Sequence, residues 1–377
     1  MSMTDAAHAL APARGKTALV MAGGTGGHIF PGLAVAQALR EKGWCVHWLG
    51  APESMESRIV PPQGFAFESV AFGGVRGKGI KTLLSLPLRL LKAVAQSRAL
   101  LQRVRPQVVV GMGGYITVPA GLAAALKGVP LILHEQNSVA GTANRVLMPL
   151  ARRVFTAFPN VLATTASAAD GRSGKVQWVG NPLRRAFLAQ PDPVTRWQDR
   201  SGPLRVLVLG GSLGAQALNT TVPAALALLP QSHRPQVVHQ SGAAHIDALR
   251  AAYAQAGVQA ELLPFIDDTA QALAEADVVI GRAGASTVTE LAAVGAAAVL
   301  VPFPHAVDDH QTSNARFLAA HDAAWLQPQN DFTPQWLAGF LQRITRAELL
   351  DKACKAKRCE KLHATEQIVA ACEEVMA

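Results

Sequence analysis

Short apolar runs alternate along the chain with longer stretches in which apolar residues recur at helical spacing. Several of the runs end in glycine, as in KTALVMAGG (16–24) and LRVLVLGG (204–211). Apolar runs without alternating polar positions are typical of strands that are buried on both faces. The pattern therefore predicts repeated strand–helix units, which build a parallel β-sheet covered by helices on both sides.

The stretch TGGHIFPGLAVAQALREKG (25–43) carries the signals of a helix. Pro31 favours the first helical turn, and the basic residues before Gly43 favour the last one. We therefore expect a helix that starts near Pro31 and ends before Gly43, with a glycine-rich loop between it and the preceding strand.

The two halves of the chain have the same pattern. The glycine pair that begins at Gly23 recurs at Gly210, an offset of 210 − 23 = 187 residues. A second correspondence links PQVVVGMGGY (106–115) with ADVVIGRAGA (276–285). Short apolar strands such as GVPLILHEQN (128–137) and AAAVLVPFPH (296–305) continue through both halves. Turn-rich segments at 164–175 and 190–203 lie between the halves. We predict an α/β protein with two doubly wound domains, 14–182 and 183–356, that face each other across a cleft.

Composition and charge narrow the range of partners. The chain has 377 residues, of which 50% are hydrophobic and 16% are charged, which is enough apolar material for two cores. Its formal net charge of +9 favours an anionic partner. Only 5% of the residues are aromatic, so platforms for stacking nucleic-acid bases are not expected and nucleic acid is an unfavoured partner.

The cysteines and the chain start bear on the cellular compartment. The four cysteines form no CxxC pair and no zinc-ligand spacing, which indicates reduced thiols in a cytoplasmic protein and no metal centre. No DxD motif is present either. The positive charges near the start follow an alanine-rich part, the wrong order for a signal peptide. The apolar run 291–304 is too short to span a bilayer.

The glycine loops match neither of two common nucleotide motifs. From Gly24 the pattern GxGxx ends on Ile29 rather than glycine, and no Gly-Lys-Ser/Thr follows. A Rossmann dehydrogenase is therefore disfavoured. Four glycine loops at matching places still suggest phosphate binding, because helix N-termini present free N–H groups and a partial positive charge. Two domains with such loops indicate two phosphorylated substrates.

Longer motifs make the interpretation specific. They are GGTGGHIFPGLAVAQAL, GMGGYITVPAGLAA, HEQNSVAGTANR, GNPLR, GGSLGAQALN, FIDD, GRAGASTVTEL and PFPHAVDDHQTSNA, in this order. The chain thereby resembles the N-acetylglucosaminyltransferases of bacterial peptidoglycan synthesis, in glycosyltransferase family 28. The resemblance implies the GT-B fold, two Rossmann-like domains with a C-terminal helix (357–377) that folds back on the first.

The same resemblance implies the reaction. N-acetylglucosamine moves from UDP-N-acetylglucosamine to the C4 hydroxyl of undecaprenyl-diphospho-N-acetylmuramoyl-pentapeptide (lipid I), with inversion at the anomeric carbon, and gives lipid II. No cofactor is implied. The enzyme is expected to be peripheral, on the cytoplasmic face of the inner membrane. Alternatives are a UDP-N-acetylglucosamine epimerase, another GT-B glycosyltransferase, and a non-catalytic nucleotide-sugar sensor.

By resemblance the second half binds the nucleotide sugar. Ser212 and its loop amides, with Arg184, bind the donor diphosphate, and the backbone at Ile266 reads the uracil. Glu290 accepts hydrogen bonds from the ribose hydroxyls, and Gln311 binds the transferred sugar. The residues that open a helix beneath the nucleotide are Ala285, Ser286, Thr287, Val288 and Thr289.

The first half supplies the other wall of the site. Thr25, Gly26, Gly27 and Asn137 close over the donor sugar in this interpretation, and the glycine loops hold the acceptor diphosphate. The chain departs from some family members at His310–Gln311, where they carry a glutamine pair.

Transfer to a hydroxyl requires a base. His28 follows a phosphate-type loop at an expected helix N-terminus, where the helix dipole favours the neutral imidazole that can accept a proton. Glu135, at the end of a strand in the same half, is the rival base, and the sequence leaves the choice open. His134 is expected to be structural.

A membrane-binding surface is predicted in the stretch 75–105, which mixes leucines with basic residues. We expect the part after Leu88 to pack inward and Ile80 to Leu86 to form an exposed patch. Apolar residues beside basic ones suit an anionic lipid surface.

Overall fold

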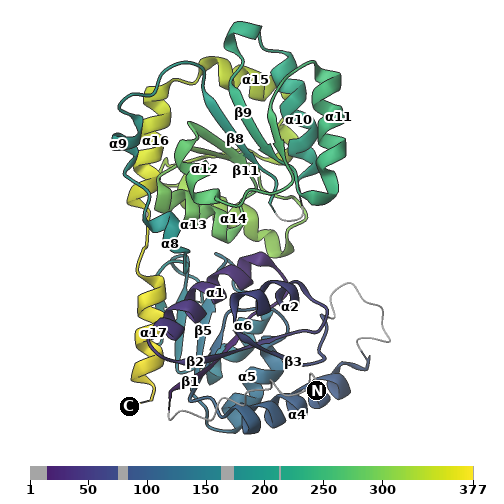
Figure 1. Ribbon diagram of the computed structural model, residues 1–377, viewed down its shortest axis with the longest axis vertical. Coiled ribbons are helices and arrows are strands. Elements are labelled where there is room, and N and C mark those ends of the chain that lie inside the picture. The colour runs from purple at the N-terminus through teal and green to yellow at the C-terminus, as the bar shows by residue number, and fades with distance from the viewer. Residues whose placement is uncertain (1–14, 75–83, 163–173, 212–213, 377) are drawn as a thin grey trace, which may run out of the picture.

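The computed structural model describes residues 15–74, 84–162, 174–211 and 214–376 and contains two parallel β-sheets (Figure 1). The first sheet has the order β3-β2-β1-β4-β5-β6-β7, and the second has the order β10-β9-β8-β11-β12-β13. All strand pairs among these residues are parallel. The strands of the first sheet are β1 (Thr17–Met21), β2 (Cys45–Gly50), β3 (Ala66–Ser69), β4 (Val108–Gly111), β5 (Leu131–Glu135), β6 (Arg153–Thr156) and β7 (Val176–Trp178). Those of the second are β8 (Arg205–Leu209), β9 (Gln236–Gln240), β10 (Glu261–Leu263), β11 (Val278–Gly281), β12 (Ala298–Leu300) and β13 (Trp325–Leu326).

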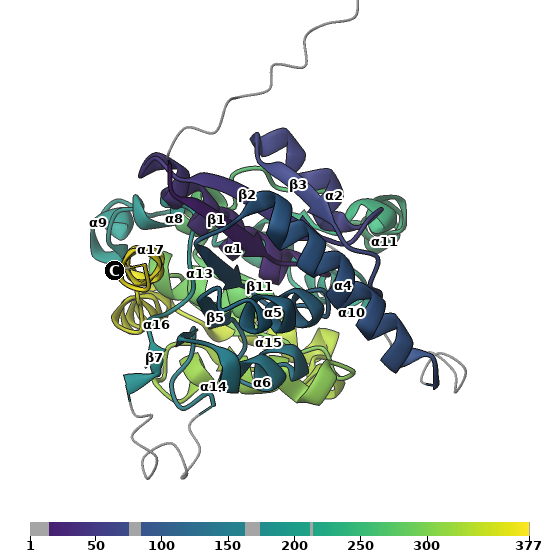
Figure 2. The same ribbon diagram turned by 90° about the horizontal axis from the view of Figure 1, so that it is seen from below.

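Helices cover both sheets, as Figures 1 and 2 show. Around the first sheet lie α1 (Gly26–Glu41), α2 (Met55–Ile59), α4 (Leu86–Val104), α5 (Thr117–Leu126) and α6 (Thr142–Leu147). The second sheet is accompanied by α8 (Arg185–Leu188), α9 (Pro193–Trp197), α10 (Gln216–Ala227), α11 (Ile246–Ala256), α12 (Thr269–Glu275), α13 (Ala285–Val294), α14 (His310–Ala319), α15 (Pro334–Arg343) and α16 (Arg346–Arg358). The last helix is α17 (Ala364–Glu374).

The internal repeat is visible in the two strand orders. The first six strands of each sheet run third, second, first, fourth, fifth, sixth in chain order, and β7 is added only to the first sheet. Strand β4 therefore corresponds to β11 and β5 to β12. The matched stretches 106–115 and 276–285 contain β4 and β11, which occupy the same place in the two orders. The predicted α/β class with two doubly wound parallel sheets is confirmed.

The start of the first helix was predicted too late. Helix α1 begins at Gly26, which places Pro31 inside it rather than in its first turn. Proline at that position lacks the N–H that would bond to the carbonyl of Gly27, and its ring crowds that carbonyl. The helix continues through this single gap, and its N-terminus therefore reaches the glycine loop itself.

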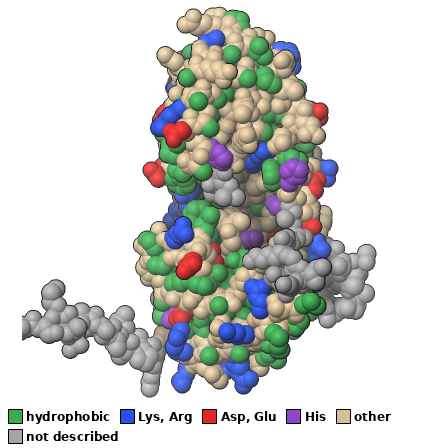
Figure 3. Space-filling model, turned by 90° about the vertical axis from the view of Figure 1, so that its right-hand side faces the viewer, with side chains coloured by type: hydrophobic (Ala, Val, Ile, Leu, Met, Phe, Trp, Pro, Cys, Tyr) green, Lys and Arg blue, Asp and Glu red, His purple; other side chains and the backbone are tan. Residues whose placement is uncertain are grey.

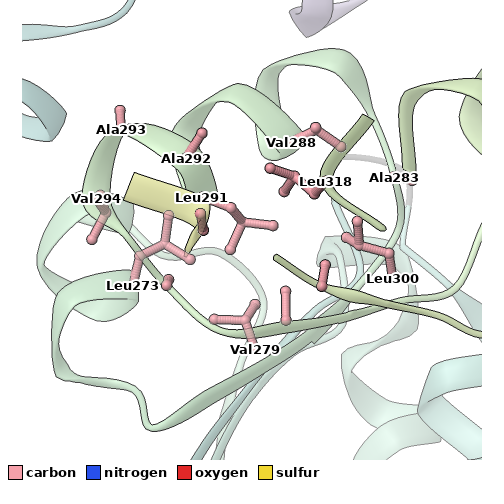
Figure 4. Close-up of a cluster of buried hydrophobic side chains, with 14 of the residues drawn as sticks. Leu273, Val279, Ala283, Val288, Leu291, Ala292, Ala293, Val294, Leu300 and Leu318 are labelled. Carbon is pink, nitrogen blue, oxygen red and sulfur yellow. The ribbon is translucent and has the colours of Figure 1, made fainter. Parts of the chain in front are cut away.

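Separate apolar clusters lie on the two faces of each sheet. In the second domain, Val279 and Leu300 of neighbouring strands meet Val288 and Leu291 of α13, and all four are almost fully buried (Figure 4). Burial of α13 against the sheet fixes the position of its first turn, at the carboxyl end of β11.

The C-terminal segment crosses between the domains. Helix α16 packs on α9 and α13 of the second domain, whereas α17 packs on α1 of the first. Ile368, Val369 and Cys372 of α17 are buried in the same cluster as Val20 and Leu39. The domain boundaries at 182 and 356 stay a prediction.

The exposed leucines extend further along the chain than expected. Leu84, Leu88 and Leu91 are 77%, 74% and 66% exposed. Leu86 and Leu90 instead pack against the first domain's core. The expectation that residues after Leu88 turn inward is therefore wrong at Leu91, because one face of the amphipathic α4 stays in solvent. The part of the expected patch at 75–83 lies outside the described residues. Within the described ranges, no helix has the length and hydrophobicity needed to cross a membrane.

Truncating the buried face of α17 should destabilise the first domain. Ile368 is fully buried, so Ile368→Ala leaves a cavity and should lower the free energy of unfolding by about 2–5 kcal/mol, seen as a lower urea midpoint. Glu366→Ala, at an exposed position of the same helix, should change it by less than about 0.5 kcal/mol. Equal midpoints for both variants would show that α17 adds no stability.

Candidate active site

The two glycine loops of the first domain touch through their backbones. Gly114, after β4, has φ of +90°, and a Cβ there would lie 2.3 Å from the carbonyl oxygen of Gly23, after β1. Only glycine tolerates both the dihedral and the approach. The carboxyl ends of β1 and β4 thus form one continuous backbone surface.

A buried side chain braces the first glycine loop of each domain. In the first domain the fully buried Glu56 accepts hydrogen bonds from the amides of Gly24 (3.2 Å) and Ala51 (3.0 Å). In the second domain Gln240 accepts from the amide of Gly211 (3.1 Å) and donates to its carbonyl (3.1 Å). These contacts fix the backbones of Gly24 and Gly211 ahead of the helices that follow.

The N-terminus of α1 carries four of the predicted site residues. Thr25 is the N-cap, its side chain makes no capping hydrogen bond, and Gly26 and Gly27 follow in the first turn. His28 is half-buried, and its Nδ1 lies 2.8 Å from Oε1 of Gln136, in the loop after β5. The N–H groups at this helix end form a site that favours anions.

Glu135, the rival to His28, is engaged by its own loop. The carboxylate is 1% exposed and accepts from the amides of Asn137 (3.0 Å) and Gly141 (2.9 Å) and from the side chain of Asn144 (2.8 Å). Both carboxylate oxygens are therefore occupied by hydrogen bonds within the first domain. These contacts favour an anchoring role for Glu135.

The loop after β5 also meets the second domain. Asn314 of α14 is fully buried, and its Oδ1 accepts from the amide (2.9 Å) and hydroxyl (2.8 Å) of Ser138. Its amide nitrogen donates to the carbonyl of Ala283, after β11 (3.1 Å), and to Oδ1 of Asn137 (3.4 Å). These bonds bring together the carboxyl ends of the two sheets, and Figure 3 shows a hollow between the domains with histidines around it.

The predicted residues 285–289 form the first turns of α13. Val288 belongs to the core, and the Thr289 hydroxyl bonds to the carbonyls of Ala285 and Ser286 and to Asn181. The hydroxyl of Ser286 is buried without a hydrogen-bond partner among the described residues. Any ligand contact here would come from Ser286, Thr287 and the free amides of the helix end.

Glu290 has an unusual environment. Its surface is partly open to solvent, yet protein atoms crowd its carboxyl group, and this desolvation raises its pKa to about 7 although the charge of Arg184 acts in the opposite direction. Arg184 itself lies over the rings of Phe187 (5.0 Å) and Phe30 (5.7 Å). Because Phe30 belongs to α1, Arg184 touches both domains beside Glu290.

The other predicted donor-site residues lie in loops of the second domain. Gln311, in the first turn of α14, accepts from the amide of Phe303 (2.9 Å). Ile266 is partly buried between β10 and α12. Ser212 lies outside the described residues.

The part of the chain that the structure describes holds neither a metal-binding cluster nor a second candidate active site. No group of three His, Cys, Asp or Glu side chains suited to a metal ion exists among the described residues. A cavity of about 460 Å³ at α9 and α12 is lined by arginines. Of these, Arg196 donates to the carbonyls of Ala274, Val294 and Gly295, and Arg200 pairs with the buried Asp277. These arginines stabilise the ends of α12 and α13, so the cavity is structural.

Family models match both domains. Residues 18–156 match the glycosyltransferase family 28 N-terminal domain, and residues 205–369 match the family's C-terminal domain. The chain belongs to glycosyltransferase family 28. The predicted resemblance is thereby confirmed.

Relatives in the family are similar over almost their full length. Two bear the name UDP-N-acetylglucosamine--N-acetylmuramyl-(pentapeptide) pyrophosphoryl-undecaprenol N-acetylglucosamine transferase. The protein of Albidiferax ferrireducens is 66% identical over 365 residues, 96% of this chain and 91% of the relative. That of Paracidovorax citrulli is 64% identical over 362 residues, 96% and 99% of the two chains. The crystal structure of Acinetobacter baumannii MurG superposes with a TM-score of 0.80 at 38% identity, and covers 95% of this chain and 99% of that one.

The sequence analysis did not identify several residues that hold the predicted site residues in place. Glu56, Gln136 and Asn314 each hold a predicted site residue or loop. Gln136 and Asn314 lie inside the quoted motifs HEQN and HQTSNA. Their positions therefore carried a signal, but their partners are distant in the sequence and become visible only in the fold.

The raised pKa of Glu290 should make stability depend on pH. The folded pKa of about 7 lies above the ordinary value of 4.5, so the contribution of Glu290 to stability is fully present below pH 4.5 and is lost as pH rises towards 7. Glu290→Gln should remove this loss and be more stable than the parent at pH 8 by about 1–3 kcal/mol, measured by urea unfolding. The exposed Glu261→Gln is the control, and the same pH trend in both variants would contradict the assignment.

Proposed function

We propose that this chain transfers N-acetylglucosamine from UDP-N-acetylglucosamine to undecaprenyl-diphospho-N-acetylmuramoyl-pentapeptide (lipid I) and produces lipid II. The observation that carries the proposal is the identity of 66% over 96% of the chain with a relative named for this activity. The geometry supports it, because each domain presents glycines ahead of a helix N-terminus, which suits two diphosphate substrates.

The donor binds to the second domain in this proposal. Amides near Gly211, together with Arg184, hold the diphosphate, and Glu290 accepts hydrogen bonds from the ribose. The backbone at Ile266 contacts the uracil. The unpartnered Ser286 hydroxyl and the first turn of α13 support a ligand at this place. Asn137 and Gln311 approach the sugar from the two domains.

The chemical step is a single displacement with inversion. The C4 hydroxyl of the acceptor attacks the anomeric carbon, the bond between that carbon and the diphosphate oxygen breaks, and its electron pair leaves with UDP. His28 takes the hydroxyl proton. Helix N-termini and Arg184 stabilise the charge that develops on the diphosphate. The hydrogen bonds already accepted by Glu135 support His28 as the base.

The lipid-linked acceptor requires contact with a bilayer. Leu84, Leu88 and Leu91 form an exposed apolar row on and before α4, and Leu126 of the adjacent α5 is 79% exposed. Lys92 and Arg98 are exposed on the same helix. Hydrophobic and basic side chains lie side by side on this lower domain in Figure 3. We place the protein peripherally on the cytoplasmic membrane face through this surface.

A transferase assay tests the function. The protein, radiolabelled UDP-N-acetylglucosamine and a lipid-linked muramoyl-pentapeptide should yield a labelled disaccharide lipid and UDP. A free isomerised sugar without lipid product would instead establish an epimerase and overturn the proposal.

Removing His28 should affect turnover more than binding. His28→Ala should lower kcat by about 10²–10⁴-fold while the donor KM changes less than about threefold, because a base acts in the transition state. His233→Ala, at an exposed position, is the control in the same steady-state assay. An effect of His28→Ala on KM alone would return the base role to Glu135.

Charged substitutions in the leucine row should weaken membrane binding. Leu84→Asp with Leu88→Asp should reduce co-sedimentation with anionic vesicles by about tenfold or more, because two apolar contacts are lost. Activity on a soluble short-chain acceptor should stay near that of the parent. The control is a double variant of exposed apolar residues in the second domain, Val194→Asp with Leu228→Asp. Unchanged vesicle binding in the first double variant would place the docking surface elsewhere.

A further inference from the structure

A row of hydrogen bonds runs through the first domain to His28. It begins at the carbonyl oxygen of Gly180, which lies 2.9 Å from Nε2 of His134. Nδ1 of His134 lies 3.0 Å from Nε2 of Gln136, and Oε1 of Gln136 lies 2.8 Å from Nδ1 of His28. His134 is fully buried and Gln136 is 1% exposed, so water does not compete for these contacts.

The donors and acceptors in the row have only one consistent assignment. A carbonyl oxygen only accepts, so Nε2 of His134 must carry a hydrogen. Burial lowers the pKa of His134 to about 4, so its ring is neutral at pH 7 and its Nδ1 is an acceptor. The nitrogen of Gln136 donates to that Nδ1, and its other close neighbour, the His134 carbonyl at 3.3 Å, is also an acceptor. The amide oxygen of Gln136 therefore points towards His28.

This assignment reaches the ring of His28. Its Nδ1 faces an acceptor and must carry a hydrogen, and a neutral imidazole has only one, so Nε2 keeps its lone pair. Gly113 makes the contact possible, because a Cβ there would lie 2.8 Å from Nδ1 of His28 and 3.3 Å from Oε1 of Gln136.

We infer that Gln136 and His134 are positioning residues, which hold His28 in the tautomer whose Nε2 accepts the proton of the attacking hydroxyl. The inference rests on the proposed function, in which His28 is the base. When the new glycosidic bond forms and the bond to UDP breaks, the hydroxyl proton moves to Nε2. Without the row of hydrogen bonds His28 would populate both tautomers, and only one of them has its lone pair on Nε2.

Nitrogen NMR of ring-labelled histidine tests the tautomer directly. The parent protein should show His28 protonated at Nδ1, with its signals assigned by their loss in His28→Ala. Gln136→Met and His134→Phe preserve approximate volume and remove the polar contacts, so both should move His28 towards protonation at Nε2. Both should also lower kcat by about 10–100-fold, less than the loss of the base itself, with donor KM changed less than about threefold. Gln177→Met, on β7 at the edge of the same sheet, is the control for the Gln-to-Met change.

Each result of these NMR and kinetic experiments tests a different part of the inference. Protonation at Nε2 in the parent protein, or an unchanged tautomer in both variants, would overturn the inference whatever the kinetics. A shifted tautomer with normal kcat, when His28→Ala is strongly impaired, would overturn the positioning role. A shifted tautomer with normal kcat in all variants, His28→Ala included, would remove the base role from the proposed function and leave the hydrogen-bond assignment intact.

Discussion

The requirement that buried polar groups find partners governs the structure at the end of β5. His134, Glu135 and Gln136 are consecutive and almost fully buried. Each would lower the stability of the fold by several kcal/mol if its polar atoms were left unpaired. Successive side chains of a strand point to opposite faces, so His134 and Gln136 share one side and Glu135 takes the other. Hydrogen bonds link His134 through Gln136 to His28. The Glu135 carboxylate accepts hydrogen bonds from the loop that carries Asn137. One buried segment thus organises both the expected base and the expected sugar contact.

The repeated architecture explains why both domains place candidate anion sites at the same sheet edge, each held by a different side chain. Parallel strands bring their carboxyl ends to one edge, and each domain places a glycine loop and a helix N-terminus there. The carboxyl group of Glu56 holds the loop of the first domain, whereas the amide of Gln240 holds Gly211 in the second. The contact of Asn314 with Ser138 then joins these edges, so the two sites face each other across a short distance.

The sequence predicted the repeating features and missed the contacts between distant segments. Apolar runs, glycines and the offset between the halves were sufficient for two parallel sheets, because these features are local and periodic. The start of α1 was misplaced because Pro31 was taken as a first-turn signal, whereas the helix accommodates it. The choice between His28 and Glu135 could not be made from sequence, since it depends on hydrogen bonds to Gln136 and Gly141 that only the fold creates.

The far end of the row that orients His28 lies where the chain passes between the domains. Gly180 precedes α8 in the first crossing, and it touches Lys361 of the returning segment so closely that a Cβ would lie 2.3 Å from the Cβ of that lysine. Its φ of +90° is a second reason for glycine. The segment before α8 and the returning segment at Lys361 therefore pack together at the Gly180 carbonyl, which accepts from His134. The backbone of Gly180 is also tied to the first sheet, because its N–H donates to the carbonyl of Thr156 at 3.2 Å. The far end of the row is therefore anchored in the same domain as His28.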